Sequence, residues 1–350
     1  MSLLDDWIAQ AKERRASDVH IVANLPVRCR VDGQLENLTA YPLSFEDCEN
    51  LGRELAGKRY AEMEDIGELD LARSFPCGIR TRINLFRQQG SLSAAIRLLA
   101  ERIPELEELN LPPVVGSFQD YRTGIVLVTG ETGSGKSTTL AAVLNRINRT
   151  RSAHIITLED PIEYVYTPDQ CVINQRQVGT DTRSYADGLR AILREDPDVI
   201  LIGEMRDLNT IETALTAAET GHLVFATLHT NSAADAIDRM VNVFPEGQQR
   251  QIRLQLSTTL RAVVSQQLLP DVDGEQVPAF EVMQMNSAIR SMIRDGKNHQ
   301  IDNAIAAGSS EGMLTMDQSI LALYQAGRIT RETALNYADN PEQLRRRMGN

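Results

Sequence analysis

The pattern of hydrophobic positions differs between the first hundred residues and the rest of the chain. Near the start, hydrophobic residues at helical intervals predict an amphipathic helix: Leu3, Leu4, Trp7, Ile8 and Ala11. Further on, hydrophobic and polar residues alternate, as in a half-buried strand. One face of that strand would carry Ile79, Thr81, Ile83 and Leu85, and the other Arg80, Arg82 and Asn84. The first hundred residues therefore predict a small α/β domain rich in strands.

Turn and cap residues divide this region further. Asp32-Gly33 stands between two short runs and is typical of a tight hairpin. Ser44 is a good cap for a helix over roughly 45–57. The segments "ELDLARSF" and "GIRTRINLF" predict two paired strands, and "SLSAAIRLL" continues the sheet. We assign this smaller N-terminal domain to residues 1–99.

The segment "ERIPELEELNLPPVV" interrupts the pattern. It is acidic and contains Pro104, Pro112 and Pro113, a composition typical of a connection between domains. We expect a linker over residues 100–113 and a second domain over residues 114–350.

The second domain shows short, wholly apolar runs separated by helical stretches. The runs are "GIVLVTG", "HIITLED", "VILIGE" and "LVFATLH". Helices are expected over Lys136–Arg149, Tyr185–Arg194 and Asn209–Thr220. Such alternation predicts a parallel sheet covered on both faces. From about residue 246 the chain is predicted to be mostly helical, interrupted by one hairpin over "LLPDVDGEQVPAFEVM".

Charge and composition narrow the classes of protein. The chain has 350 residues, with 36 Lys and Arg against 48 Asp and Glu, for a net charge of −12. A nucleic-acid motor needs a basic stripe that neutralises phosphates, so this balance disfavours nucleic acid as a partner. The run Arg345, Arg346 and Arg347 is better explained as a solvated helix end stabilised by the helix dipole.

Cysteine usage and the lack of targeting segments bear on location. Cys29, Cys48, Cys77 and Cys171 form no CxxC pair, as expected for packed thiols in a reducing cytoplasm. The N-terminus carries Asp5 and Asp6 and no basic region typical of a signal peptide. No apolar run approaches the roughly 18 residues of a membrane span. We expect a cytoplasmic protein that does not insert into the membrane and reaches it only through partners.

The segment "GETGSGKST" (130–138) carries the chemistry of phosphate binding. It matches G-x-x-x-x-G-K-[ST] and lies between a predicted strand and a predicted helix, as this pattern requires. Its glycines let backbone N–H groups surround phosphate oxygens, and the helix N-terminus adds a positive field. Lys136 is expected to reach the β- and γ-phosphates, and the Ser137 hydroxyl to ligate Mg²⁺. The predicted nucleotide contacts are Gly130, Thr132, Gly133, Ser134, Gly135, Lys136, Ser137 and Thr138.

Two of the predicted strands end in acid. Glu159 and Asp160 end one, with Glu163 just beyond Pro161. Glu204 follows the other, where Gly203 stands in place of the more usual Asp and is expected to leave room beside the phosphate loop. Nucleotide hydrolysis needs one carboxylate that organises the metal and one group that positions the attacking water. On these grounds, either Glu163 or Glu204 can serve as the base that activates the water.

Histidines and arginines supply further candidates. His229 ends a predicted parallel strand, at the edge where such sheets bind ligands, and is a candidate γ-phosphate sensor. His222 is a candidate cap of the preceding helix. The predicted strands of the N-terminal domain carry Arg80, Arg82 and Arg97. These arginines are either solvated or serve as arginine fingers that complete an ATPase site.

With these residues in view, the chain resembles the type II/IV secretion and pilus ATPases, most closely their pilus retraction branch. "GETGSGKSTTLAAVL" is similar to the family's Walker A, "ITLEDPIEYV" to its Asp box, and "VILIGEMRD" and "TGHLVFATLHT" to its Walker B region and His box. "AIRSMIRDGK" (288–297) and "GMLTMDQSI" (312–320) resemble segments of the retraction branch.

The resemblance implies a RecA-like P-loop NTPase domain behind a PAS-like front domain, assembled as a homohexameric ring. It implies ATP and Mg²⁺ as cofactors, Glu163 as the catalytic glutamate and Glu204 as the Walker B acid that organises the metal. His229 would belong to the His box, and Arg80, Arg82 and Arg97 to the arginine-bearing strands. The implied partner is an inner-membrane pilus platform protein, and the implied function is pilus retraction in twitching motility.

Departures from the family keep other functions open. Glu131 replaces the usual proline of the loop and puts negative charge near the phosphates, which suits a regulatory ring subunit that binds nucleotide but hydrolyses it weakly. Within the same class, the alternative is a secretion or pseudopilus assembly ATPase. The assembly ATPases carry a longer N-terminal region and a four-cysteine zinc element, and this sequence has neither.

Overall fold

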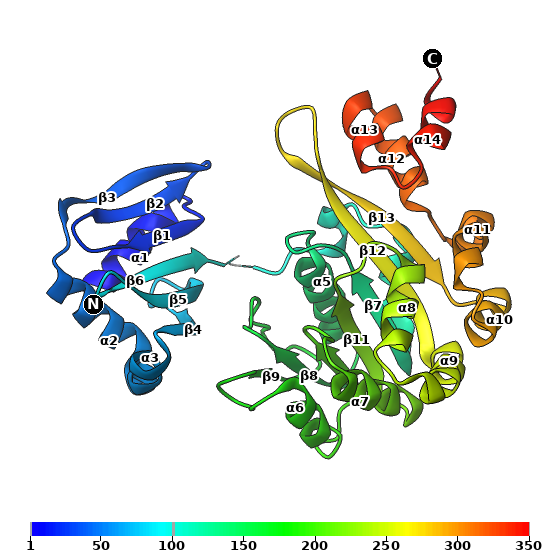
Figure 1. Ribbon diagram of the computed structural model, residues 1–350, viewed down its shortest axis with the longest axis horizontal. Helices are drawn as coiled ribbons and strands as arrows, with labels where there is room; N and C mark the ends of the chain where they lie inside the picture. Colours follow the sequence, from blue (N-terminus) through cyan, green and yellow to red (C-terminus); the bar gives the residue numbers. More distant parts are fainter. Residues whose placement is uncertain (1, 100–101, 350) are drawn as a thin grey trace. The chain divides into compact units, whose positions relative to one another are not determined.

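The protein folds into two units, seen in the computed structural model of Figure 1, which describes residues 2–99 and 102–349. The first unit comprises Met1–Arg102 together with the short segment Pro161–Val165. The second comprises Ile103–Asp160 and Tyr166–Asn350. Each unit has its own sheet and hydrophobic core, so each can be understood separately.

The first unit is a PAS-like α/β domain with a six-stranded antiparallel sheet in the order β3-β2-β1-β6-β5-β4. Its strands are β1 (Asp18–Ile21), β2 (Pro26–Val31), β3 (Gln34–Pro42), β4 (Glu68–Ser74), β5 (Arg80–Gln88) and β6 (Ser91–Leu98). Its helices are α1 (Leu3–Glu13), α2 (Phe45–Ala56) and α3 (Tyr60–Ile66). Buried residues of all three helices join alternate strand residues in one core.

The local predictions for this unit are confirmed. In α1 the predicted apolar face is buried apart from Leu3, which is exposed. Asp32 and Gly33 both adopt positive φ, 46° and 79°, in the turn that joins β2 to β3. The Ser44 side chain accepts a hydrogen bond from the Asp47 N–H and caps α2. β4 and β5 pair as expected. Each outcome follows from a signal contained in a few adjacent residues.

The second unit has the RecA-like arrangement of a mainly parallel sheet. The strand order is β13-β12-β7-β11-β10-β8-β9, and only β13 runs antiparallel to its neighbour. The strands are β7 (Gly124–Thr129), β8 (His154–Glu159), β9 (Val172–Gln177), β10 (Val199–Ile202), β11 (Leu223–Leu228), β12 (Leu260–Pro270) and β13 (Gln276–Gln284). Every residue of β7, β10 and β11 is buried, as the continuous apolar runs predict.

Helices connect and cover this sheet. They are α4 (Pro113–Gly116), α5 (Lys136–Thr150), α6 (Tyr185–Ile192), α7 (Leu208–Glu219), α8 (Ala233–Asn242) and α9 (Glu246–Thr259). After β13 come α10 (Ser287–Asp295), α11 (Ile301–Ala307), α12 (Met316–Gln325), α13 (Arg331–Tyr337) and α14 (Pro341–Met348). Figure 1 shows these last five helices following one another beside the β12–β13 hairpin. No helix in the described part of the chain is both long and apolar enough to span a membrane.

Two strands depart from the sequence-based expectation. The region after residue 246 was expected to be mostly helical, but Leu260–Pro270 forms β12, which pairs in parallel with β7 in the main sheet. Ser265 and Gln266 interrupt its apolar pattern although both are buried. β9 is a partly exposed edge strand whose polar sequence gives no strand signal. Both strands owe their place to partners far away in the sequence.

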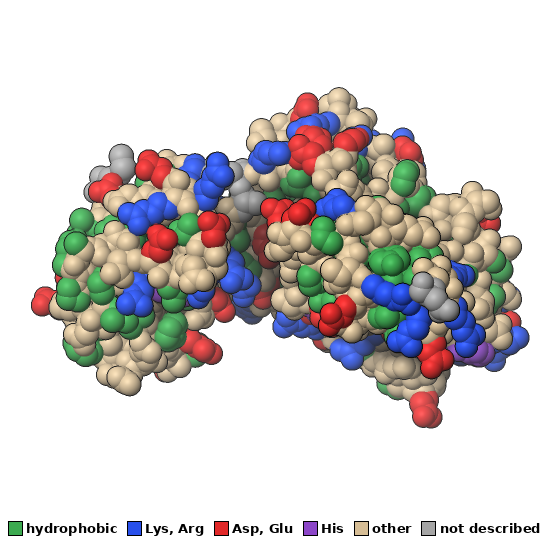
Figure 2. Space-filling model, turned by 90° about the horizontal axis from the view of Figure 1, so that it is seen from above, with side chains coloured by type: hydrophobic (Ala, Val, Ile, Leu, Met, Phe, Trp, Pro, Cys, Tyr) green, Lys and Arg blue, Asp and Glu red, His purple; other side chains and the backbone are tan. Residues whose placement is uncertain are grey.

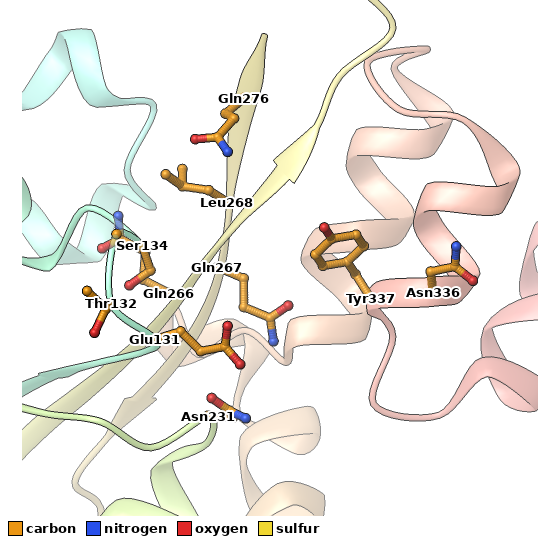
Figure 3. A pocket seen from close by; sticks show the side chains of 11 residues that line it. Glu131, Thr132, Ser134, Asn231, Gln266, Gln267, Leu268, Gln276, Asn336 and Tyr337 are labelled. Atoms are coloured by element: carbon orange, nitrogen blue, oxygen red, sulfur yellow. The ribbon is translucent and has the colours of Figure 1, made fainter. Parts of the chain in front are cut away.

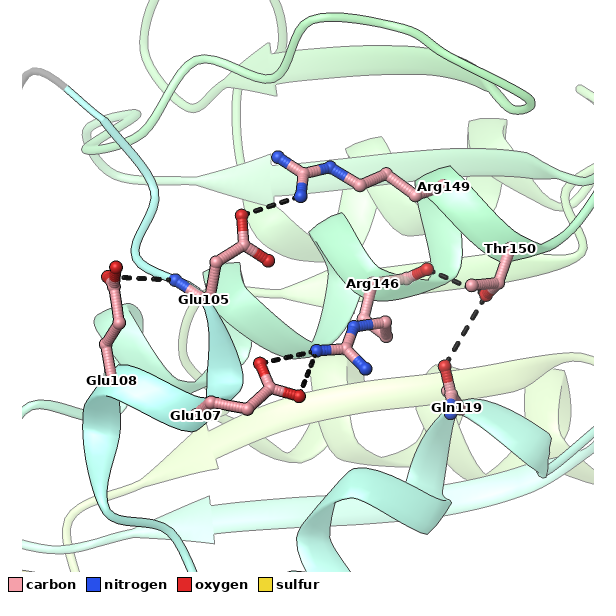
Figure 4. Close-up of polar contacts among 7 residues, drawn as sticks. All are labelled: Glu105, Glu107, Glu108, Gln119, Arg146, Arg149 and Thr150. Atoms are coloured by element: carbon pink, nitrogen blue, oxygen red, sulfur yellow. Dashed lines mark hydrogen bonds and ion pairs between the residues drawn. The ribbon is translucent and has the colours of Figure 1, made fainter.

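The expected linker also differs from the structure. Residues 100–101 lie outside the described part, but the segment from Ile103 onward belongs to the second unit. Its Glu105 and Glu107 carboxylates pair with Arg149 and Arg146 of α5, each at 2.6 Å (Figure 4), and Leu106 is buried. The acidic residues that were interpreted as a connection between domains therefore form ion pairs along α5. Pairs this exposed each contribute at most about 1 kcal/mol.

One acidic side chain lies inside the larger core. Glu281 of β13 is only 3% exposed, and its Oε1 accepts a hydrogen bond from the Ala233 N–H at 2.7 Å. Burial, reinforced by the charges of Asp302 and Asp339, raises the pKa of Glu281 from 4.5 to about 7, against hydrogen bonds that lower it. Between these two values the folded chain holds a proton that the unfolded chain has lost. Stability from this group is therefore present below pH 4.5 and falls as the pH rises toward 7.

The change Glu281→Gln is expected to remove this dependence. Relative to the wild type, the free energy of unfolding of the variant should rise between pH 5 and pH 8 by up to about 3 kcal/mol. Denaturant titrations at several pH values measure the difference, and Glu275→Gln, an exposed change on the same hairpin, controls for loss of one negative charge. A difference that stays constant across this range would contradict the prediction.

Candidate active site

The phosphate loop leaves the carboxyl end of β7 and enters α5. Gly130, Gly133 and Gly135 have φ of 141°, 85° and 89°, a region in which L side chains are strained. A Cβ at Gly130 would lie 2.2 Å from the Gln266 carbonyl oxygen, and one at Gly135 would lie 2.7 Å from Gln266 Nε2. The loop therefore needs glycine both for its backbone conformation and for its close approach to β12.

Lysine and hydroxyl side chains surround this loop. Lys136 is 8% exposed, and its Nζ donates to the carbonyl oxygens of Gly130 and Glu131 at 2.8 and 2.7 Å. The Ser134 hydroxyl is buried and has no hydrogen-bond partner within the described part of the chain. Thr132 and Ser137 are exposed. A buried cation beside backbone amides at a helix N-terminus forms a cradle for phosphate oxygens.

Gln266 of β12 supports the loop and was missed by the sequence analysis. It is 4% exposed, and its Oε1 accepts a hydrogen bond from Thr139 Oγ1 of α5 at 2.9 Å. The residue thus meets the loop at Gly130 and Gly135 and α5 one turn further on. No sequence signal could reveal it, because its segment was read as helix and its partners lie more than one hundred residues earlier.

A pocket of 350 Å³ opens beside the loop and contains the unusual residue Glu131. Residues of the loop, of β12 and of α13 line it, including Gln267 and Tyr337, together with Asn231 from the turn before α8 and Gln276 at the start of β13. Figure 3 shows the Glu131 carboxylate between the side chains of Gln267 and Asn231, with Tyr337 on the opposite wall. Its charge therefore faces a polar pocket next to the loop.

Glu204 lies between an arginine and a histidine at the ends of β10 and β11. One carboxylate oxygen lies 2.6 Å from Arg206 Nε and 3.1 Å from His229 Nε2. Burial pushes the pKa of Glu204 upward, but the hydrogen bond from Arg206 and the charges of His229 and Arg206 bring it below its ordinary value. The structure therefore brings together two of the predicted site residues, Glu204 and His229, and keeps the acid ionised.

The glycine before this acid has a different neighbour from the one expected. Gly203 was read as leaving room beside the phosphate loop. A Cβ there would instead lie 3.0 Å from the Tyr185 hydroxyl and 3.1 Å from the Leu158 carbonyl oxygen. The space is needed by α6 and the end of β8. The Gly203 carbonyl also accepts a short hydrogen bond from the Thr227 hydroxyl of β11.

Tyr185 is a second residue that the sequence analysis missed. Burial raises the pKa of its phenol, and the charges of Asp160, Glu204 and Glu159 raise it further. The phenol therefore stays protonated and can donate a hydrogen bond among these three acids. Glu159 itself accepts from Thr157 Oγ1 at 2.6 Å and from Gln175 Nε2 at 3.2 Å. Of the acids at the end of β8, Glu159 is thus tied within its own sheet.

Glu163 and the three candidate arginines lie in the first unit. Arg80 Nε donates to the Ile162 carbonyl oxygen at 2.9 Å, next to the partly buried Glu163. Arg97 forms a 2.9 Å ion pair with Asp18, and Arg82 is its exposed register partner across β5 and β6. Arg80 is therefore associated with the Asp-box segment, whereas Arg97 has a local partner of its own.

Other sequence-based candidates have local roles. The His222 ring nitrogen Nδ1 lies 2.9 Å from the Ala217 carbonyl oxygen, so this histidine caps the end of α7 as suggested. Asp207 caps the start of the same helix by accepting from the Thr210 N–H at 3.0 Å. In the segment 288–297, Ile289 and Ile293 are buried, and Arg290 Nη1 donates to the Ser257 carbonyl oxygen at 2.6 Å. Part of that segment therefore holds α10 against α9.

The family of type II/IV secretion system proteins matches residues 92–344, which covers the whole loop and the carboxyl ends of the parallel strands. The chain belongs to this family. Like the family's ATPases, it is an enzyme that hydrolyses ATP.

Similar proteins in this family include pilus retraction ATPases. The chain is 44% identical to the type IV pilus retraction ATPase PilT of Pseudomonas aeruginosa, over 97% of this chain and 99% of that protein. It is 44% identical to a twitching motility protein of Neisseria gonorrhoeae, over 90% of this chain and 85% of that one. A crystal structure of the pilus retraction motor PilT with bound ADP matches with a TM-score of 0.92 and 46% identity, covering 99% of each chain.

The contacts of Glu204 allow us to predict how the rate of hydrolysis depends on pH when Arg206 is replaced. Because Arg206 lowers the pKa of Glu204 and burial opposes it, Arg206→Ala should raise that pKa. If hydrolysis needs the ionised acid, the acid limb of the rate–pH profile should move to higher pH. Because the pKa of Glu204 lies below its ordinary value of 4.5 in the wild type, steady-state phosphate release from about pH 4 upward measures the shift.

Two further variants sharpen this experiment. Arg206→Lys keeps a positive charge and should shift the limb less than Arg206→Ala. Arg190→Ala, which removes an exposed arginine paired with Asp187 on α6, is the matched control. An acid limb that stays in place in Arg206→Ala, or moves to lower pH, would show that this pair does not control the acid.

Proposed function

We propose that this chain is the ATP-driven motor of type IV pilus retraction. The observation that carries the proposal is the likeness to the retraction ATPase PilT along nearly the whole of both chains. The phosphate loop and the Glu204–His229 pair on one sheet supply the groups that such an enzyme needs.

In the proposed reaction, the loop holds the triphosphate of ATP. The backbone from Gly130 to Gly135 and the side chains of Lys136, Thr132, Ser134 and Thr138 face its phosphate oxygens. The buried Ser134 hydroxyl and the glycine backbone fit this ligand, because they are polar groups at a helix N-terminus in need of an anion. The β- and γ-phosphates take Lys136 Nζ away from the loop carbonyls to which it donates.

Mg²⁺ would be held by the Ser137 hydroxyl and, directly or through water, by Glu204. When bound, the ion neutralises charge on the phosphates as the γ-phosphoryl group leaves. A serine hydroxyl at the start of α5 and an ionised carboxylate are hard oxygen ligands of the kind that Mg²⁺ takes.

The remaining groups act on the attacking water and the transferred phosphoryl group. Glu163 is the proposed base, and Glu204 is the alternative. His229, joined to Glu204, is the proposed sensor of the γ-phosphate. Arg80, Arg82 and Arg97 are the proposed arginine fingers, although the ion pair of Arg97 with Asp18 must open for that role.

In the cell, six copies would form a ring on the cytoplasmic side of the inner membrane. A pilus platform protein would bind the ring and transmit the movement to the pilus, so the ATPase itself neither inserts into the membrane nor binds nucleic acid. On the face seen in Figure 2, basic and acidic side chains occur on both units.

A second candidate is a regulatory ring subunit that binds nucleotide and hydrolyses it weakly. The position of Glu131 favours it, since this carboxylate lies in the loop and faces the adjoining polar pocket. A secretion or pseudopilus assembly ATPase is the alternative within the same class.

Removing the loop lysine separates the motor from the regulatory subunit. Purified wild type with Mg-ATP should release phosphate, and Lys136→Ala should lower the rate by about a thousandfold or more because the charge on the γ-phosphate loses its partner. Cells carrying Lys136→Ala should keep surface pili but lose twitching. Wild type no faster than Lys136→Ala would favour the regulatory subunit, and pilus loss instead of lost retraction would favour the assembly ATPase.

The two glutamates are separated by isosteric changes. If Glu163 is the base, Glu163→Gln should bind ATP normally and lower kcat by about a hundredfold or more. Glu204→Gln should instead weaken the dependence of the rate on Mg²⁺ concentration. Phosphate release and fluorescent-nucleotide binding, titrated with Mg²⁺, measure both. Near-normal turnover in Glu163→Gln together with loss in Glu204→Gln would reverse the assignment.

A further inference from the structure

A hydrogen-bonded chain runs through the core behind the phosphate loop. Thr129, the last residue of β7, donates through its hydroxyl to the Ser265 hydroxyl of β12 at 3.0 Å. Ser265 donates in turn to Glu281 Oε1 of β13 at 3.4 Å. The same carboxylate oxygen accepts from the Ala233 N–H at 2.7 Å. All three side chains are buried, so water does not compete for these bonds.

This series of hydrogen bonds joins the two segments on which hydrolysis is proposed to depend. Its first member, Thr129, directly precedes Gly130 and the phosphate loop. Its last, Ala233, is the first residue of α8 and directly follows the turn His229–Ser232. His229 holds Glu204 at one end of this turn, and Ser232 caps α8 at the other by accepting from the Asp235 N–H at 3.1 Å.

Glu281 accepts a hydrogen bond from a backbone N–H at the start of α8 that the Ser232 cap does not engage. The first N–H groups of a helix have no partner within it, and the Ser232 side chain takes only that of Asp235. The buried Ala233 N–H depends on Glu281 instead. A carboxylate at a helix N-terminus also gains from the dipole, which helps a buried acid to remain there.

Among the residues that the structure describes, no Lys, Arg or His forms a salt bridge with Glu281, so it is not half of an ion pair there. The charged groups that act on it are Asp302 of α11 and Asp339 after α13, with Asp235 and Asp317 acting on those two in turn. Asp302 and Asp339 are both acids, and their charges oppose the ionisation of Glu281.

We propose that Glu281 is a positioning residue for ATP hydrolysis, which holds the His229–Ser232 turn in register with the strand that carries the phosphate loop. The inference rests on the proposed function, because it assumes that His229 acts at the γ-phosphate. Nucleotide binding depends on the loop, whereas the hydrogen bonds described for Glu281 come from Ala233 and Ser265. Hydrolysis depends on where the turn places His229, and a displacement of about 1 Å can lower a rate by about a hundredfold.

The expected result is a change in kcat without a matching change in binding. In the full-length protein, Glu281→Ala should lower kcat for Mg-ATP by about tenfold to a hundredfold and leave KM and the Kd for ADP within about threefold. Glu281→Gln keeps an oxygen that can accept from Ala233 and should restore most of kcat. Ser265→Ala breaks the link to Thr129 but spares the cap of α8, and it should also lower kcat.

A matched control and a double-mutant cycle separate positioning from simple destabilisation. Val282→Ala removes a buried side chain from the neighbouring position of β13 and should lower the melting temperature with kcat unchanged. In a His229→Ala background, Glu281→Ala should have no further effect on kcat, because it acts through that turn.

The outcomes distinguish this inference from the function on which it rests. If Val282→Ala and Glu281→Ala lower kcat equally, or if the effects of Glu281→Ala and His229→Ala multiply, the residue is structural and the inference is overturned. If wild type releases no more phosphate than Lys136→Ala, the proposed function itself fails. Active wild type with unchanged kcat in Glu281→Ala overturns the inference alone.

Discussion

The parallel pairing of β12 with β7 is the constraint on which the candidate active site depends. Their register sets Ser265 beside Thr129, at the point where β7 becomes the phosphate loop. The next residue, Gln266, then presses its carbonyl against Gly130 and its amide toward Gly135. A shift of one residue would turn Gln266 to the other face of the sheet and remove this wall. The conformation of the loop thus depends on its close contact with a strand as well as on its glycines.

The same pairing explains why polar residues occur in a core that is otherwise apolar. Lys136, Ser265, Gln266 and Glu281 are all buried, and each has a hydrogen-bond partner on a different element. An unpaired polar group at such a site would cost about 1–3 kcal/mol, so each bond fixes the position of two elements relative to each other. These residues specify one arrangement of β7, β12, β13 and α8 around the loop.

Neighbouring side chains determine the protonation states of the groups near the ends of β10 and β11. Glu204 is shared by Arg206 and His229, which keeps it ionised, whereas Tyr185 is kept neutral by burial and by the acids around it. Two groups close together are thereby held in different protonation states. Such separation is typical of sites that handle protons and anionic substrates.

The sequence by itself determined the features whose signals are local. Continuous apolar runs gave the buried parallel strands, and Ser44 and Asp32-Gly33 gave a helix start and a turn. The segment 130–138 gave the loop, and the resemblance of several segments gave the family. The tertiary structure alone decided the place of β12, the pairing of Glu105 and Glu107 with α5, the neighbours of Gly203 and the burial of Glu281. The physical reason is that a polar residue can be buried only where a partner meets it, and here each partner comes from a distant segment.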